Sequence, residues 1–332
     1  MAFFLEIGGF AIKILIVSAA LGFLAIMVTG LFRRKFPEGQ LNLVHLNLHY
    51  QEMKSQLQRA ILDKKVFKAI QKEKPPEKKK RNVFVIDFHG DIAATTVCDL
   101  REQVTAVLTV AGPEDEVVVV LESGGGIFHN YGLAASQLTR LREKDIPLTV
   151  CVDKIAASGG YLMACVANRI LAAPFAILGS IGVVVMFPNF HRLLKKYDVD
   201  YMELTAGEFK RTISHMGEIT EKGKEKFLEE LASSHELVKN FITENRPQVD
   251  MAKVATGEHW HGVEALELAL ADELRTSDDY LLTLSEEAEI YRLEFEASKT
   301  VKEKFAGIFA EAGDRLLLKW WDRFAKDTRF RS

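Results

Sequence analysis

Ser158 lies in the hexapeptide AASGGY (156–161), between two alanines and two glycines. A serine hydroxyl becomes a nucleophile when a base removes its proton and backbone amides stabilise the oxyanion that forms. Small residues around a serine are equally typical of a helix N-cap, where the side-chain oxygen accepts a backbone hydrogen bond. The hexapeptide alone favours the cap, so the rest of the chain has to decide between the two interpretations.

Two other segments could complete nucleophilic chemistry at this serine. The glycines of ESGGGI (122–127) follow the β-branched run VVVVL and let the backbone turn, so that its amides point outward as an oxyanion cradle. Lys210, in GEFKR, carries an amine, and a lysine amine acts as a base when desolvation lowers its pKa. Taken alone, Lys210 is typical of a surface lysine.

The serine also stands where a strand would run into a helix. The run LTVCV leads through DKIAA into Ser158, and the helix-like YLMACVA follows the two glycines. A hydroxyl near a helix N-terminus lies where free N–H groups favour developing negative charge.

The segments that must position these residues have the sequence pattern of an α/β domain. From Val83 on, short β-branched runs (VFVIDF, VVVVL and LTVCV) alternate with helix-like segments, which predicts a parallel sheet with helices packed on it. The apolar stretch from Ile170 to Phe187 is long enough to suggest a membrane helix. Because Pro174, Gly179 and Gly182 divide it into pieces of strand length, we expect buried core instead.

Composition narrows the possible functions. The chain has 332 residues, 48% of them hydrophobic, and a formal net charge of −3, so we expect a folded protein without a nucleic-acid partner. Three cysteines, Cys98, Cys151 and Cys165, lie in apolar settings without CxxC spacing and are interpreted as small core residues. No phosphate-binding glycine loop and no HExxH motif occurs, so we expect neither a metal nor a cofactor.

The N-terminus predicts a membrane anchor over residues 1–35. The run from Ile14 to Phe32 is uncharged and would span roughly 28 Å as a helix, enough to cross a bilayer. A cleaved signal peptide is the alternative, but the run is long for one and its bulky boundary is a poor cleavage site. The basic residues at 33–35 favour a cytoplasmic location for the rest of the chain.

The remaining segments divide the chain further. Residues 36–82 are strongly charged and predict a basic helical stalk or linker, ended by Pro75 and Pro76. The candidate catalytic residues fall in a domain over residues 83–284. Residues 285–332 predict an amphipathic helical segment, with an apolar stripe from Val301 to Trp320 that could pack, contact the membrane or bind another subunit.

Five motifs in order, ESGGG, AASGGY, LGSIGV, GEFKR and TGEHWHGVEALELALADEL, resemble the signal peptide peptidase A family of Ser/Lys serine peptidases over nearly the whole chain. The resemblance implies Ser158 as nucleophile and Lys210 as general base. It further implies the amides of Gly125 and Gly159 as oxyanion donors, and Ser180 as the residue that orients the lysine amine. The implied activity is endopeptidase hydrolysis of peptides or misfolded proteins near a bacterial inner membrane.

The fold that this resemblance implies is the stack of ββα units shared by Clp protease and crotonase, whose subunits assemble into homo-oligomeric rings. Clp-type relatives take their base from a histidine shortly after the nucleophile helix. Here that region reads ILGSIGVVVMF and contains no histidine, so Lys210 is the candidate base. One position departs from the family pattern: Gly124 stands where proline is common, which leaves the rigidity of the cradle open.

Two alternatives remain at this point. A crotonase-like enzyme acting on acyl-CoA thioesters would use a glycine-lined cradle without a serine nucleophile. A catalytically inactive membrane scaffold would keep the fold alone, although the presence of both Ser158 and Lys210 argues against it.

Overall fold

A computed structural model describes residues 39–70 and 81–297 of the chain. Packing divides the chain into two units, residues 1–40 with 296–332 and residues 41–295. The first unit lies almost entirely outside the described residues, as do the expected anchor at 1–35 and the stripe from Val301 to Trp320. The second unit contains every candidate catalytic residue.

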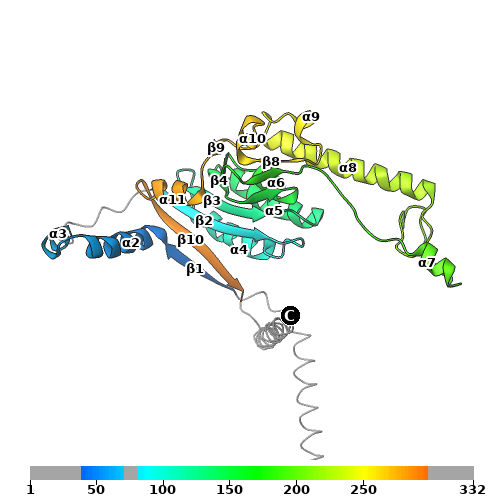
Figure 1. Cartoon of the computed structure of the whole chain (residues 1–332), viewed down its shortest axis with the longest axis horizontal. Coiled ribbons are helices and arrows are strands. Elements are labelled where there is room, and N and C mark those ends of the chain that lie inside the picture. The colour runs from blue at the N-terminus through cyan, green and yellow to red at the C-terminus, as the bar shows by residue number, and fades with distance from the viewer. Residues whose placement is uncertain (1–38, 71–80, 298–332) are drawn as a thin grey trace, which may run out of the picture. The chain divides into compact units, whose positions relative to one another are not determined.

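Strands and helices alternate along most of the described chain (Figure 1). In chain order the elements are β1 (Gly39–His45), α2 (Leu46–Ile61), α3 (Lys64–Ile70), β2 (Arg81–Gly90), α4 (Val97–Leu108), β3 (Glu116–Ser123), α5 (Phe128–Arg142), β4 (Leu148–Val152), β5 (Ile155–Ala157), α6 (Gly159–Ala164), β6 (Arg169–Ala172), β7 (Ile177–Gly179), α7 (His191–Lys196), α8 (Glu221–Asn245), α9 (Met251–Val254), β8 (His259–His261), α10 (Gly262–Glu267), β9 (Glu273–Leu274), α11 (Ser277–Leu284) and β10 (Ala288–Ala297).

The strands form one mostly parallel sheet, which confirms the predicted α/β class. The main path runs in the order β1-β10-β2-β3-β4-β6-β9, and β5, β7 and β8 branch from β3. The pairings of β2 with β3 and of β3 with β4 are parallel, whereas β7 and β8 pair antiparallel. Parallel strands covered on both faces are apolar throughout, as the run VVVVL within β3 is.

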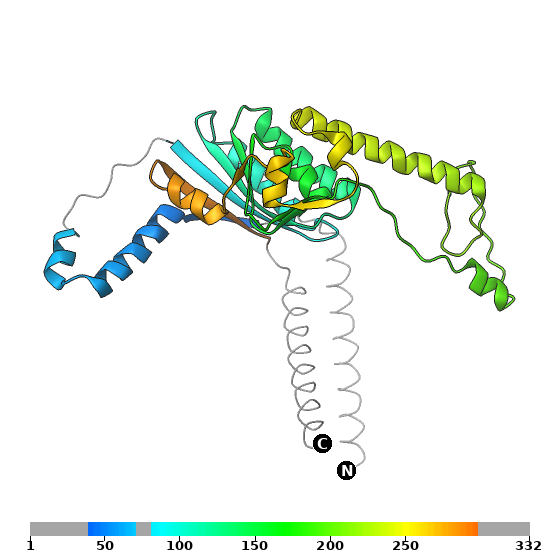
Figure 2. The ribbon, with the colours of Figure 1, turned by 45° about the horizontal axis from the view of Figure 1, so that its top comes forward.

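The two faces of the sheet bury two separate apolar clusters. Along β3, Val117, Val119 and Leu121 join a cluster with α4, α5 and α6, whereas Val118 faces α11 and the start of α2. This alternation follows from the period of two residues in a strand. Figure 2 shows the central strands running between these helices.

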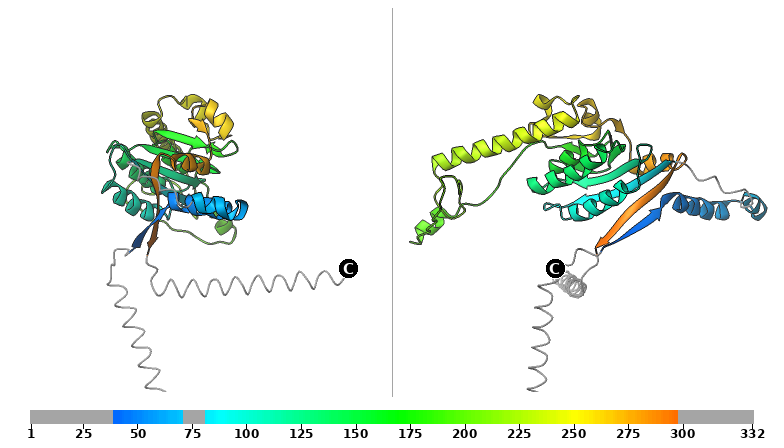
Figure 3. Two further views of the ribbon diagram at one scale, coloured as in Figure 1. Left: turned by 90° about the vertical axis from the view of Figure 1, so that its left-hand side faces the viewer. Right: turned by 180° about the vertical axis from the view of Figure 1, so that it is seen from behind.

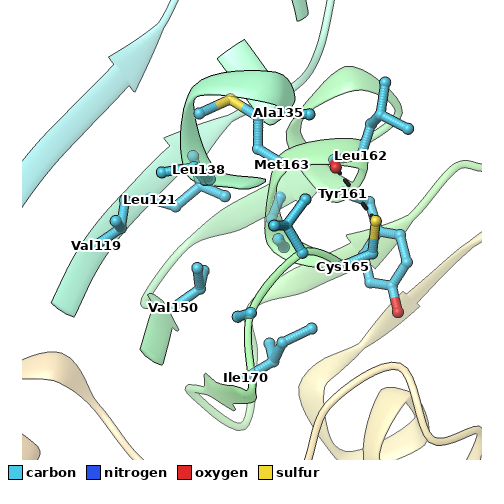
Figure 4. Close-up of a cluster of buried hydrophobic side chains, with 14 of the residues drawn as sticks. Val119, Leu121, Ala135, Leu138, Val150, Tyr161, Leu162, Met163, Cys165 and Ile170 are labelled. Carbon is cyan, nitrogen blue, oxygen red and sulfur yellow. Dashed lines mark hydrogen bonds between the residues drawn. The ribbon is translucent and has the colours of Figure 1, made fainter. Parts of the chain in front are cut away.

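Helix α6 is the most deeply buried helix near the sheet. All six of its residues are buried, and Met163 lies beside Ala135 of α5 in the main apolar cluster (Figure 4). Burial of an apolar side chain of this size contributes about 1.5–3 kcal/mol to folding. The turn that begins this helix is therefore held by the main core.

Three expectations need correction. The stretch from Ile170 to Phe187 is only partly buried core, because Phe175, Val184 and Met186 are 88%, 74% and 86% exposed. Cys98 is exposed, since it lies on the outer side of α4, next to the buried Val97. Residues 288–297 form strand β10, although the segment from 285 on was expected to be helical; Ile290 and Leu293 are buried where β10 pairs with β2.

The segment expected to form the stalk contains both helices and strands. Helices α2 and α3 lie within residues 36–82, but β1 precedes them and pairs with β10, and β2 begins at Arg81. Among residues 39–70 and 81–297, no helix is both long and apolar enough to cross a membrane.

Candidate active site

Three neighbouring parallel strands bring the candidate residues together at their carboxyl ends. Ser123 of β3 pairs with Ala156 of β5, and Ala157 pairs with Gly179 of β7. Ser158 therefore follows the end of β5 directly, and Ser180 follows the end of β7. Ligands of open α/β sheets bind at this edge, where strands give way to loops.

Ser158 occupies a strained turn between β5 and α6. Its φ of 52° and ψ of −117° lie outside the regions that a residue with a side chain normally adopts, at a cost of roughly 1–3 kcal/mol. The turn is held by the hydrogen bond from the Ser158 amide to the Gly179 carbonyl, 2.7 Å long. Such a strand-to-helix turn exposes the hydroxyl of a nucleophilic serine at the edge of a sheet.

The simple helix-cap interpretation of Ser158 is wrong. The residue stands at the N-cap position of α6, but its side chain makes no capping hydrogen bond. The hydroxyl is half-buried and has no partner within the described residues. It is thus available to a substrate.

Gly125 and Gly159 lie against this serine, as the cradle requires. Gly125 has a φ of +83°, and a Cβ placed on it would come within 2.6 Å of the Gly159 nitrogen and 2.8 Å of the Ser158 Cβ. The Gly159 amide makes no hydrogen bond within the described residues. The Gly125 amide donates to the Ser123 hydroxyl at 3.1 Å.

The sequence analysis missed the residues beneath the cradle. Ser123, 2% exposed, lies 2.5 Å from the phenol oxygen of Tyr131, which is fully buried on α5. The phenol donates to the Asp91 carbonyl at 2.7 Å, and burial raises the pKa of Tyr131. A polar residue at the end of an apolar strand was the only sequence signal for Ser123, and nothing in the helix pattern set Tyr131 apart.

A cleft of about 570 Å³ opens beside Ser158. Its wall is mostly apolar and includes side chains from the loops after β3 and β7 and from helices α6 and α8. Among them are Ile127, Leu162, Ile181, Val183, Val185 and Val238. An open cleft with a mostly apolar wall is typical of a ligand-binding site, and Ser158 lies at its edge.

Backbone hydrogen bonds of Gly179 and Ser180 link Ser180 to the turn that carries Ser158. Its amide donates to the Glu258 carbonyl at 2.6 Å, and it follows Gly179, the residue that accepts from the Ser158 amide. Ser180 is half-buried, and its hydroxyl has no partner within the described residues.

Lys210 lies elsewhere in the chain, on an exposed loop. We call residues 183–220, between β7 and α8, the arm. The arm packs on the first turn of α8, because a Cβ placed on Gly223 would overlap the Thr212 carbonyl. The ammonium groups of Lys222 and Lys226 each lie 5.6 Å from the centroid of the Phe209 ring. Figure 3, seen from behind, shows α8 running from the sheet out to the arm.

The length of α8 separates the two candidate catalytic residues. Val238 lines the cleft at Ser158, whereas Gly223 marks the end that holds the arm. The two residues are fifteen positions apart, which corresponds to a rise of about 22 Å along the helix. No hydrogen bond joins Lys210 to Ser158 or to Ser180. One chain, as described, therefore brings together Ser158, Gly125, Gly159 and Ser180, but not Lys210.

The arm is also unusually apolar for an exposed segment. Met202 and Leu204 are 79% and 86% exposed, and Lys210 itself is exposed. Many large apolar side chains exposed on one segment are typical of a binding surface for another molecule. Its large exposed side chains are Val184, Val185, Met186, Phe190, Leu193, Tyr197, Val199, Tyr201, Met202, Leu204, Phe209 and Met216.

The described part of the chain offers no metal site. Within residues 39–70 and 81–297, no group of three or more His, Cys, Asp or Glu side chains is arranged to hold a metal ion.

Comparison with known proteins agrees with this geometry. Residues 2–138 match the N-terminal model of peptidase family S49, and residues 140–291 match the model of peptidase family S49 itself. A probable protease SohB of Haemophilus influenzae is 52% identical over 251 residues, 76% of this chain and 71% of the relative. A probable protease SohB of Buchnera aphidicola subsp. Schlechtendalia chinensis is 42% identical over 304 residues, 85% of this chain and all of the relative.

A more distant relative is Protease 4 of Haemophilus influenzae, 30% identical over 169 residues, 48% of this chain and 26% of that protein. The two family models together span most of the chain, and the serine on its strained turn falls within the second match. The chain therefore belongs to peptidase family S49, a family of serine proteases.

Proposed function

We propose that this protease is a membrane-anchored serine endopeptidase that cleaves peptides or misfolded proteins near the bacterial inner membrane, with Ser158 as nucleophile and Lys210 as base. The observation that carries the proposal is the hydroxyl of Ser158, held on a strained turn between two glycine amides at the edge of an apolar cleft. A peptide that lies extended in this cleft would present its carbonyl carbon to the hydroxyl.

The chemistry would proceed in two halves. The lysine amine takes the Ser158 proton while Oγ attacks the carbonyl carbon, and the amides of Gly125 and Gly159 stabilise the oxyanion. The C–N bond then breaks, and the leaving amine takes the proton back from the lysine. A water molecule, deprotonated by the same amine, then attacks the acyl-enzyme. The bond between the carbonyl carbon and Ser158 Oγ breaks, Oγ takes the proton from the lysine, and the acid is released.

The base is expected to come from a second copy of the chain. The arm holds Lys210 away from the serine of its own chain, and an exposed lysine is a poor base until desolvation lowers its pKa. A neighbouring copy docked on the apolar surface of the arm would bury the amine and bring it to a cleft. Ser180, beside Ser158, would then orient the amine.

We extend the proposal to the fold, the assembly and the membrane location of the protein. We expect ββα units stacked as in Clp protease and crotonase, and copies assembled in a homo-oligomeric ring. We also expect a single-pass anchor at residues 1–35, with the catalytic unit on the cytoplasmic side, as the basic residues at 33–35 favour. Carbonate washing of membranes should leave the full chain in the membrane fraction.

Two other functions compete with this one. A crotonase-like acyl-CoA enzyme would not require a strained serine with a free hydroxyl. An inactive scaffold would not require an open cleft beside that serine. A fluorophosphonate probe separates them. We expect labelling of Ser158 in the full chain and none in Ser158→Ala; absence of labelling in the folded protein would contradict the peptidase.

Mixing inactive copies tests the origin of the base. Ser158→Ala and Lys210→Ala chains, co-expressed at equal levels, should recover about a quarter of wild-type turnover, the chance that an intact serine meets an intact lysine in a head-to-tail ring. Each variant alone should be inactive. If the mixture recovers no turnover, although the probe labels Ser158 in the wild-type protein, the base comes from the same chain as the serine.

A further inference from the structure

The cradle depends on a peptide bond between two glycines. The bond between Gly124 and Gly125 carries one of the two expected oxyanion donors, the Gly125 amide. Glycine has no side chain to restrict its dihedral angles, so this peptide plane rotates freely unless something outside it holds it. An amide that points in many directions stabilises an oxyanion poorly, because the advantage of a preorganised donor is lost.

Ser123 and Tyr131 supply a chain of hydrogen bonds that ends on this amide. The phenol has a single proton, which it donates to the Asp91 carbonyl at 2.7 Å. Ser123 then donates its own proton to the phenol oxygen 2.5 Å away, the nearer acceptor, rather than to the Gly90 carbonyl at 3.3 Å, and it accepts from the Gly125 amide at 3.1 Å. Every group in the chain has a partner, and consecutive hydrogen bonds of this kind strengthen one another.

The same tyrosine also holds the second donor. A Cβ placed on Gly159 would overlap the Tyr131 ring, so this ring lies directly under the Gly159 backbone. A Cβ on Gly160 would come within 2.5 Å of the Ser123 carbonyl. Tyr131 thus contacts one donor residue through its ring and reaches the other through Ser123.

Close packing keeps this pair in place. Ser123 is 2% exposed and Tyr131 is fully buried. On the far side, a Cβ on Gly90 would come within 2.5 Å of the phenol oxygen and 2.6 Å of the Ser123 hydroxyl oxygen, so neither side chain has room to turn away. Burial raises the pKa of Tyr131, which keeps the phenol protonated as a donor in neutral solution.

We propose that Tyr131 and Ser123 are positioning residues that fix the direction of the Gly125 amide and the place of the Gly159 amide. The proposal rests on the proposed function, in which these amides stabilise the oxyanion. Part of this proposal is that the Gly125 amide shares its proton between the Ser123 hydroxyl, at 3.1 Å, and the oxyanion in the cleft, as a three-centre hydrogen bond does.

The first test removes the hydroxyl groups one at a time from the full chain. Ser123→Ala and Tyr131→Phe should each lower kcat about 10-fold with KM little changed, less than the roughly 10²–10³-fold loss of a whole oxyanion donor. The double variant should be little worse than either single one, because both act through the same amide.

A matched control separates this effect from general loosening of the core. Tyr161 is also a fully buried tyrosine, and its phenol donates to the Leu270 carbonyl at 3.2 Å, away from the cradle. Tyr161→Phe should lower the thermal midpoint about as much as Tyr131→Phe does, yet keep wild-type kcat. An equal loss of kcat in the control would overturn the proposal.

The second test measures the oxyanion directly. A peptide boronic acid forms a tetrahedral anion on Ser158, so its affinity should fall about 10-fold in Ser123→Ala, whereas the affinity of the same peptide with an amide end should not change. Equal losses for both ligands, or wild-type kcat in both hydroxyl variants, would overturn the proposal. If Ser158→Ala itself keeps its turnover, the proposed function fails instead.

Discussion

The two halves of the candidate active site are held in very different ways. The half with Ser158 stands on the main core: helix α6 is buried throughout, and the strained serine is tied to Gly179 across the sheet. The half with Lys210 stands on an exposed loop at the far end of α8, among apolar side chains with no core around them. The chain therefore builds its nucleophile and cradle alone, whereas the base depends on a surface that another molecule has to cover.

The largest expected effect is on turnover, where the two halves should behave alike. Ser158→Ala and Lys210→Ala should each remove nearly all activity, by roughly 10³-fold or more, and the double variant should be little worse because the residues act as a unit. Lys210→Arg should fail as well, since a guanidinium stays protonated. The assay is steady-state hydrolysis of a fluorogenic peptide.

Histidine variants serve as the controls for this comparison. His129, His191 and His215, the histidines nearest the motifs, should each accept Gln with activity largely kept. A histidine whose loss abolishes hydrolysis in a folded protein, while Lys210→Ala does not, would replace the Ser/Lys assignment with a histidine mechanism.

The next largest effect is on the free energy of unfolding, and it concerns the end of α8 that packs on the core. Arg246, at the end of α8, has a side chain only 2% exposed, donates to both Asp272 carboxylate oxygens at 2.7 and 2.8 Å, and donates to the Ala269 carbonyl. Asp272→Ala leaves this guanidinium buried without its partner. The free energy of unfolding should fall by about 3 kcal/mol, the lower end for a buried pair because the Asp272 side chain is 31% exposed.

Urea unfolding measures this change, and an exposed ion pair on the same helix gives the control. Glu236→Ala removes a pair with Lys239 on the surface of α8 and should leave the urea midpoint unchanged. Equal midpoints for Asp272→Ala and Glu236→Ala would show that the pair of Arg246 with Asp272 is not what holds α8.

A pair of glycine variants compares the backbone of the two halves. Gly125 and Gly207 have φ values of +83° and +101°, so alanine is strained at both, by about 1 kcal/mol or more. At Gly125 the new Cβ would also come within 2.7 Å of the Ala157 carbonyl, whereas at Gly207 the nearest atom is the Lys210 Cβ at 3.9 Å. Gly125→Ala should therefore lower the thermal midpoint clearly more than Gly207→Ala.

The smallest expected effect concerns the exchange of backbone amides. In dilute protein the amides of the arm should exchange with solvent much faster than those of β3 and β4, because exposed segments open at low cost. If a second copy covers the arm, raising the protein concentration should slow exchange there and nowhere in the sheet. Hydrogen exchange with mass spectrometry resolves the two regions, and arm protection independent of concentration would argue for a single-chain site.

Much of the nucleophile half could be predicted from local patterns. The β-branched runs of β3 and β4 and the small residues of AASGGY indicate a strand, a tight turn and a helix, because each follows from the preferences of neighbouring residues. The same reasoning failed at Phe175, Val184 and Met186, which were predicted to be core but are exposed to solvent. Hydropathy reports which side chains gain from burial, not whether the chain itself provides the partner.

The sequence by itself determined the class of fold, the serine on a strand-to-helix turn and the family. These features depend on the order and spacing of motifs, which can be read without coordinates. Only the tertiary structure decided which residues meet. It brought Gly125 against Gly159, placed Ser123 and Tyr131 beneath them, and set Lys210 at the other end of a helix. These contacts join residues far apart in the chain, and their geometry depends on strand pairing and on the length of α8, which local periodicity does not specify.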